Sequence, residues 1–202
     1  MQTSDPRQIS DEKKFPIVCI GGSAGGLDAY VSLLKHLPFD MGVAIVIVNH
    51  VTSEPTTLHK FLSRYTKMPV ELITEKLCIK ADHVFIIPSN CDLHVLDGTF
   101  RLKSRSKPSG WPDVITVFLR SLTHHWHGAL IAVIVSGLDA DGAEALKEVK
   151  QFGGITIAQT PEGAEWSDMP ESAIKTGYVD YVLSVEAIAQ KISQIATEHV
   201  YK

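Results

Sequence analysis

The sequence has few cysteines and no apolar run long enough to cross a bilayer. Its three cysteines, Cys19, Cys78 and Cys91, form no CxxC pair, so they define neither a disulfide framework nor a thiolate metal site and fit a reducing cytoplasm. The N-terminus lacks the apolar region of a signal peptide. The net charge of −4 gives no general attraction to nucleic acid or to anionic lipid. We therefore expect a cytoplasmic protein with no nucleic-acid partner and no membrane insertion.

What the sequence does contain is a regular alternation of apolar runs with segments of helical periodicity. The most apolar runs cover 15–20, 42–48 and 129–136, and they are continuous rather than alternating. Such runs are typical of parallel strands that are covered on both faces. The sequence thus predicts an α/β fold with a doubly wound, mostly parallel sheet and helices on both faces. Within 93–103, the dipeptide Asp97-Gly98 predicts a hairpin at one edge.

We expect residues 1–14 to form a flexible N-terminal lead and residues 15–198 to form a single domain, because no repeat, low-complexity tract or internal boundary interrupts that stretch. The chain length suits one generous domain.

A glycine-rich turn follows the first apolar run, in the segment IVCIGGSAGGLDAY (17–30). The dinucleotide-binding fingerprint G-x-G-x-x-G fits in neither register, and no lysine follows Gly26 as a phosphate-binding loop requires. The pattern G-x-S-x-G does fit, from Gly21 to Gly25, between a predicted strand and a predicted helix. This pattern predicts that Ser23 is a nucleophile beside free helix N–H groups, although a glycine-rich packing turn gives a similar sequence.

A serine nucleophile needs a base and an acid that orients the base, and two further strand ends supply them. His50 directly follows the run 42–48, while Asp139 and Asp141 follow the run 129–136. The carboxyl ends of parallel strands meet at one edge of a sheet, so these side chains should converge. The chain order Ser, His, Asp differs from the Ser, Asp, His order of α/β-hydrolases and excludes that fold. The residues themselves leave Asp139 and Asp141 as alternative acids.

Most of the nine histidines have simpler interpretations than catalysis. His124, His125 and His127 cluster in THHWHG at the end of a predicted helix, with no carboxylate or cysteine close by in the sequence. Cationic side chains are favourable at a helix C-terminus. We therefore expect no metal site there.

Several segments in matching order resemble the catalytic domain of the chemotaxis protein-glutamate methylesterases, the CheB family. IGGSAGG resembles the nucleophile turn of that family, IVNHV the histidine segment and SGLDADGA the aspartate segment, and HVFIIPSN, GGITIAQ and DMPESAI are similar to further family segments. The resemblance extends from Phe15 to Ile192 and is strongest to versions that are fused to methyltransferase and sensor modules. It implies that Ser23, His50 and Asp141, rather than Asp139, are catalytic. Nothing before Phe15 could form a receiver domain, so we expect none in this sequence.

The resemblance also implies the reaction and the partner. The expected enzyme is a hydrolase that cleaves glutamyl γ-methyl esters on the helical bundle of a methyl-accepting chemoreceptor, giving glutamate and methanol, and that also deamidates glutamine at these positions. Backbone N–H groups near Ala24 and Leu138 would hold the oxyanion, and no cofactor is required. Ala24 stands where the best-known members have threonine. This difference slightly favours the alternative, a catalytically weak docking module in a sensory signalling system.

Overall fold

The computed structural model describes residues 15–50, 57–107 and 112–200, so the expected flexible lead (1–14) lies outside the described residues. Strands and helices alternate along most of this stretch, as the sequence predicts. The elements in chain order are β1 (Ile17–Gly22), α1 (Gly26–His36), β2 (Ala44–Asn49), α2 (Leu58–Leu62), β3 (Val70–Leu72), β4 (His83–Ile86), β5 (Cys91–Leu96), β6 (Thr99–Ser104), α3 (Val114–His125), β7 (Leu130–Ile134), η1 (Ala143–Ala145), α4 (Leu146–Gln151), β8 (Ile155–Gln159), η2 (Pro161–Gly163), α5 (Asp168–Lys175), β9 (Tyr181–Leu183) and α6 (Val185–Val200).

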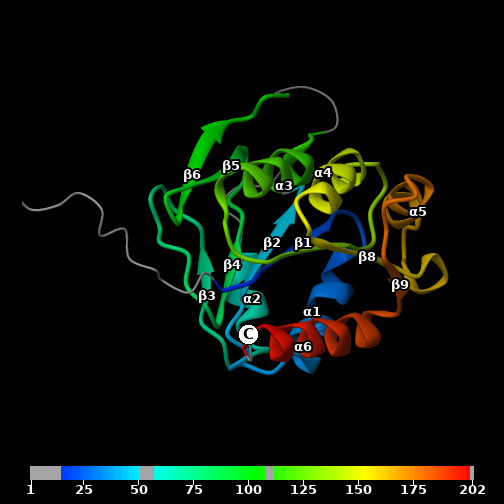
Figure 1. The fold of residues 1–202 in the computed structure, drawn as a ribbon, viewed down its shortest axis with the longest axis horizontal. Coiled ribbons are helices and arrows are strands. Elements are labelled where there is room, and N and C mark those ends of the chain that lie inside the picture. The colour runs from blue at the N-terminus through cyan, green and yellow to red at the C-terminus, as the bar shows by residue number, and fades with distance from the viewer. Residues whose placement is uncertain (1–14, 51–56, 108–111, 201–202) are drawn as a thin grey trace, which may run out of the picture.

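A seven-stranded sheet forms the centre of the molecule, in the order β3-β4-β2-β1-β7-β8-β9 (Figure 1). Each neighbouring pair of strands is parallel. From the central β1 the chain proceeds first toward β3 and β4 and then, after returning, toward β9, which makes the sheet doubly wound. Every residue of β1 and of β7 is buried, as expected for strands with helices on both faces. The predicted fold class is confirmed.

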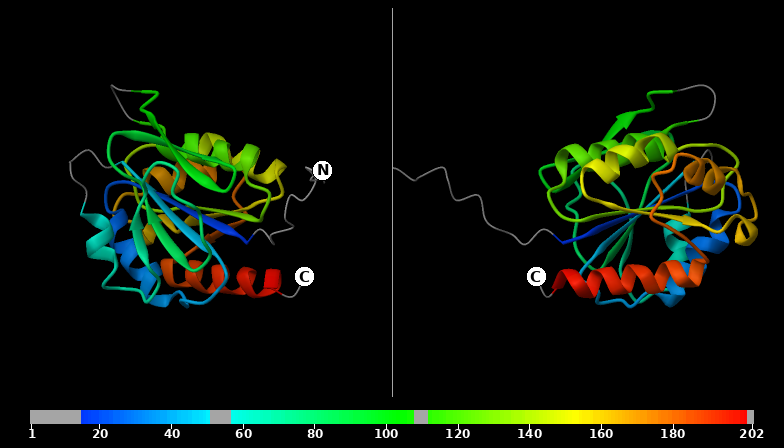
Figure 2. Two further views of the ribbon diagram at one scale, coloured as in Figure 1. Left: turned by 90° about the vertical axis from the view of Figure 1, so that its left-hand side faces the viewer. Right: turned by 45° about the vertical axis from the view of Figure 1, so that its right-hand side comes forward.

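Helices cover both faces of the sheet (Figure 2), and a hydrophobic core lies on each face. Alternate residues of β1 contribute to different cores: Val18 and Ile20 pack with α1 and α6, whereas Ile17 and Cys19 pack with α3, α4 and α5. This division follows from the period of two residues in a strand. It leaves the strand ends, rather than the strand faces, as the place for polar side chains.

The predicted hairpin is present as β5 and β6, and it forms a two-stranded antiparallel sheet of its own. Asp97 and Gly98 at its turn have φ of 50° and 68°, the left-handed conformation that a tight hairpin turn requires. The hairpin packs on α3, and the backbone N–H of Val95 donates to Ser121 Oγ of that helix at 2.9 Å. The hairpin therefore covers α3.

Element boundaries differ from the prediction in some places. The helix expected over 55–65 is α2, which spans only Leu58–Leu62, and part of the expected range lies outside the described residues. The helix expected over 143–152 begins with the tighter turn η1 before α4. No helix in the described part of the chain is long and apolar enough to cross a membrane.

Candidate active site

Three neighbouring parallel strands bring the predicted site residues to one edge of the sheet. Ser23 and His50 follow Gly22 and Asn49, which are paired in register between β1 and β2. On the other side of β1, Gly21 pairs with Ile134 of β7. The loop that follows β7 carries both aspartates. The structure thus brings the His50 imidazole and both carboxylates together at the carboxyl edge of the sheet, and Ser23 follows the strand that lies between β2 and β7.

The turn that carries Ser23 requires its glycines. A Cβ atom on Gly22 would lie 2.5 Å from Tyr30 Oη and 2.7 Å from Val135 Cγ2, so no larger residue fits. Gly25 adopts φ 68°, and its left-handed conformation turns the chain into α1. The backbone N–H of Ser23 donates to Ser136 O at 2.9 Å. The serine is therefore held at the end of β1, directly before a helix N-terminus.

Both ring nitrogens of His50 face carboxylates. Nε2 lies 2.9 Å from Asp141 Oδ2 in a hydrogen bond, and Nδ1 lies 2.9 Å from Asp139 Oδ2. The second contact is short but poorly aligned, because neither of its two atoms has a hydrogen bond of acceptable angle. The His50 side chain is only 5% exposed. Asp141 is thus the aligned partner of the imidazole, and Asp139 is a second, off-axis partner.

This environment favours the charged imidazolium. Burial by itself lowers the pKa of His50, but the contacts with Asp139 and Asp141 outweigh burial and raise the pKa to about 9. Close to neutral pH the ring is therefore predominantly protonated. A histidine must be neutral to act as a general base, so the two carboxylates, which favour the charged ring, control whether His50 can accept a proton.

Asp141 is fixed by the N-terminus of α3 rather than by side chains. Its Oδ2 accepts the backbone N–H of Ile115 at 2.8 Å, and its Oδ1 accepts that of Thr116 at 2.9 Å. The residue at the N-cap position, Asp113, makes no capping hydrogen bond and pairs with Lys107 instead. The helix dipole and these two donors stabilise the ionised carboxylate. The buried acid is therefore a structural cap as well as a partner of His50.

Ser136, which no sequence pattern singled out, joins three loops beside Ser23. Ser136 Oγ donates to Ala24 O at 2.8 Å and accepts the backbone N–H of Trp166 at 3.0 Å. Its own N–H donates to Gln159 Oε1 at 3.0 Å. The residue is almost fully buried. A buried serine directly after an apolar strand was the available signal, because a buried hydroxyl needs partners.

The backbone N–H groups close to Ser23 differ in whether they already have an acceptor. The N–H of Gly137 is occupied, since it donates to Trp166 O at 3.0 Å. The N–H groups of Ala24 and Leu138 donate to no other described residue. The Ser23 side chain likewise makes no hydrogen bond within the described ranges, so the structure does not join it directly to His50.

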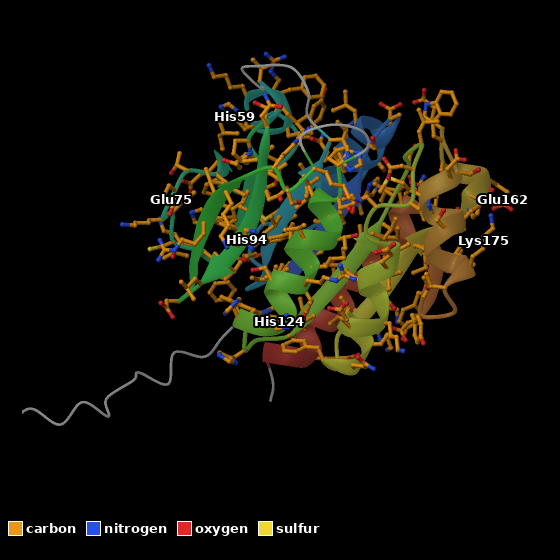
Figure 3. All side chains as sticks on the ribbon, turned by 90° about the horizontal axis from the view of Figure 1, so that it is seen from above. His59, Glu75, His94, His124, Glu162 and Lys175 are labelled. Atoms are coloured by element: carbon orange, nitrogen blue, oxygen red, sulfur yellow. The ribbon has the colours of Figure 1, made fainter. Side chains whose placement is uncertain are left out.

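Three histidines outside this edge, His36, His83 and His124, have a backbone carbonyl partner two or four residues earlier in the chain. Figure 3 shows His94 and His124 on the side of the molecule with the hairpin and α3. His124 Nδ1 lies 2.6 Å from Arg120 O one turn earlier in α3. Within the described ranges, no group of three or more His, Cys, Asp or Glu side chains is arranged to hold a metal ion.

Fold and site together have the layout of a serine hydrolase on a parallel α/β sheet. The family described as CheB methylesterase matches residues 18–192. The crystal structure of the Thermotoga maritima CheB methylesterase catalytic domain superposes with a TM-score of 0.81 at 29% identity, covering 89% of this chain and 97% of that one. The chain therefore belongs to the CheB methylesterase family.

Two relatives show how the domain occurs in other proteins. A Leptospira interrogans protein is 34% identical over 178 residues, which cover 87% of this chain and 92% of that protein. Protein-glutamate methylesterase/protein-glutamine glutaminase 4 of Burkholderia thailandensis is also 34% identical, over 88% of this chain but only 52% of its own length. The same domain is thus found both as nearly a whole protein and as about half of a longer one.

Proposed function

We propose that this protein hydrolyses glutamyl γ-methyl esters of methyl-accepting chemoreceptors to glutamate and methanol, using Ser23, His50 and Asp141. The observation that carries the proposal is the hydrogen bond of 2.9 Å between His50 Nε2 and Asp141 Oδ2, at the sheet edge where Ser23 ends β1. This bond leaves Nδ1 as the ring nitrogen that faces the serine in catalysis. Family membership supports the same reaction.

The steps follow from these positions. Ser23 Oγ attacks the ester carbonyl while His50 Nδ1 takes the serine proton, and Asp141 stabilises the resulting imidazolium. The N–H groups of Ala24 and Leu138 bind the oxyanion of the tetrahedral intermediate. His50 then protonates the leaving methanol. A water molecule, deprotonated by His50, hydrolyses the acyl-enzyme and releases glutamate.

The same site would deamidate glutamine, because an amide passes through the same kind of tetrahedral intermediate. The similar Burkholderia protein carries both activities in its name. We place the reaction in the cytoplasm, on the helical bundle of the receptor, and we expect sensor or methyltransferase modules as further partners. No step of this mechanism uses a cofactor.

The test is methanol release from chemoreceptor membranes that carry labelled methyl groups. Ser23→Ala and His50→Ala should each lower the rate by up to about a millionfold, as expected for members of a serine hydrolase triad. Ser104→Ala, at the exposed end of β6, is the matched control and should retain full activity. Equal methanol release by Ser23→Ala and wild type would refute the mechanism. No release by a folded wild-type protein would favour the alternative, a docking module with the methylesterase fold.

A further inference from the structure

The loop after β7 contains one carboxylate more than a serine triad needs. Asp139 and Asp141 approach the two ring nitrogens of His50 at the same distance of 2.9 Å. A general base needs one nitrogen free to accept the serine proton. In this arrangement Nε2 is bonded to Asp141, and the remaining nitrogen, Nδ1, faces Asp139 instead of Ser23.

We propose that Asp139 is a positioning residue that holds His50 in a charged resting state and must release Nδ1 before Ser23 can bond to it. This inference rests on the proposed function, since it assigns regulation to the same site. In the resting imidazolium the Nε2–H donates to Asp141, and the protonated Nδ1 lies beside Asp139 without an aligned hydrogen bond. Activation transfers the Nδ1 proton to water or to a buffer base, and the neutral ring keeps its Nε2 proton on Asp141. The freed lone pair of Nδ1 then accepts the hydroxyl proton of Ser23.

The two carboxylates are held by different hydrogen bonds, and this difference identifies Asp139 as the one that loses its contact with His50 first. Asp141 is bound by two helix N–H groups and by an aligned bond to His50. The Oδ1 of Asp139 accepts the N–H of Asp141 at 2.8 Å, which fixes the turn, but its Oδ2 has no aligned hydrogen bond. Small movements of the imidazole therefore break the contact with Asp139 before the contact with Asp141.

Solvent reaches the outer side of the two aspartates, while the contact between His50 Nδ1 and Asp139 Oδ2 is itself buried. A hollow of about 120 Å³ beside α3 is lined by both aspartates and opens toward the surface. Its lining also includes Asp113, which pairs with Lys107, and Glu144, which lies near Arg120. Among the described residues, Asp139 and Asp141 are the charged groups in contact with His50, and the N-terminus of α3 donates its backbone N–H groups to Asp141. Asp139 lines this hollow and also contacts Nδ1, so the Nδ1 proton can reach water only when the contact with Asp139 opens.

Charge within the site supports the same view. The contacts with the two carboxylates raise the pKa of His50 to about 9 against the effect of burial. Each unit by which that pKa falls increases the neutral fraction at pH 7 about tenfold. Removal of the Asp139 charge should therefore increase activity at neutral pH, whereas removal of a group that only orients the base would decrease it.

The experiment compares the full-length wild type with Asp139→Asn. Asparagine retains an oxygen for the N–H of Asp141 and so preserves the turn. Glu144→Gln is the matched control, because it removes a charge from the same hollow without a contact to His50. The His50 ring is titrated by NMR, assigned through loss of its signal in His50→Gln. The pH dependence of methanol release and of Ser23 labelling by a fluorophosphonate is measured in parallel.

We expect Asp139→Asn to lower the pKa of His50 by at least about one unit, to shift the acidic limb of both rate profiles by the same amount, and to raise both rates at pH 7 about tenfold. Glu144→Gln should leave the profiles unchanged. An unchanged pKa of His50 in Asp139→Asn, or a slower reaction at every pH, would overturn the inference. Failure of the proposed function has a different signature: no methanol release by wild type at any pH, while the NMR titration still reports whether Asp139 holds His50.

Discussion

Asp141→Asn should destabilise the protein in addition to slowing its reaction, because Asp141 is also the cap of α3. The carboxylate has two oxygens and accepts the N–H groups of Ile115 and Thr116, one on each oxygen. Asparagine retains one acceptor oxygen. Its amide group necessarily directs a donor at one of the two helix N–H groups or at His50.

The loss of stability in Asp141→Asn can be estimated from this pairing of an amide donor with another donor. A hydrogen bond to a charged group contributes about 1.5–3 kcal/mol, and an unsatisfied buried donor costs about 1–3 kcal/mol. Loss of one such bond at a helix N-terminus should lower the free energy of unfolding by about 2–4 kcal/mol. Against a typical total of roughly 5–15 kcal/mol, that is a substantial fraction. Part of any activity lost in Asp141→Asn therefore reflects a smaller folded population when the assay is warm or contains denaturant.

Urea unfolding measures this cost, with Asp97→Asn as the control for the same chemical change at an exposed turn residue. The ion pair with His50 is separated from the helix bonds by a double-mutant cycle with His50→Gln. In the His50→Gln background, Asp141→Asn should still cost about 2 kcal/mol, because the helix bonds remain to be lost. A cost below about 0.5 kcal/mol in that background would refute the capping argument, since it would mean that the two N–H groups gain nothing from the carboxylate.

Three further predictions concern pH and the loops around Ser23. The pKa of His50 is raised to about 9 in the folded protein, so the stabilisation from its charge is fully present below its unfolded pKa near 6.5 and is lost as pH rises through 9. The free energy of unfolding of wild type should therefore fall by about 3 kcal/mol over that range relative to His50→Gln. Urea midpoints of the two proteins that change equally with pH would contradict this. Ser136→Ala removes the hydroxyl that links Ala24 O to the Trp166 N–H beside the nucleophile, and it should lower kcat roughly ten- to a hundredfold. An unaltered kcat would contradict this prediction. Gly137→Ala would place a Cβ 1.9 Å from the Sδ of buried Met169, so urea unfolding should show a loss of about 1–3 kcal/mol. Gly163→Ala, whose Cβ would lie 3.2 Å from the Thr160 hydroxyl, is the milder comparison and should lose less.

The fold could be predicted well from the sequence because burial on both faces leaves a direct trace in composition. The runs that contain β1, β2 and β7 are continuously apolar, and their parallel pairing places the residues after them at one edge. The convergence of Ser23, His50 and the acid loop follows from that placement. The length of α2 was less predictable, because helical spacing indicates where a helix can form and tertiary packing decides how far it extends.

The details of the site were less accessible to sequence reasoning. The choice between Asp139 and Asp141 depends on the rotamer of His50 and on backbone donors, and neither is written in residue types. The structure gives both aspartates a contact with the imidazole, although only Asp141 forms an aligned hydrogen bond with that ring. The role of Ser136 could not be predicted, because a serine after a strand resembles any other turn residue until its hydrogen-bond partners are known.

The anchoring of Asp141 by main-chain groups has a consequence for how this protein tolerates change. Every residue type except proline supplies an N–H, so a substitution at Ile115 that keeps the helix intact also keeps the hydrogen bond to the acid. Thr116 has a second role, because its Oγ1 accepts the N–H of Gly142, directly after Asp141, at 2.8 Å. The Ile115 side chain instead packs against β1, where it fills the space next to Gly21. A library that randomises these positions should yield active variants with apolar residues at 115 and with a hydroxyl residue at 116, and very few with proline.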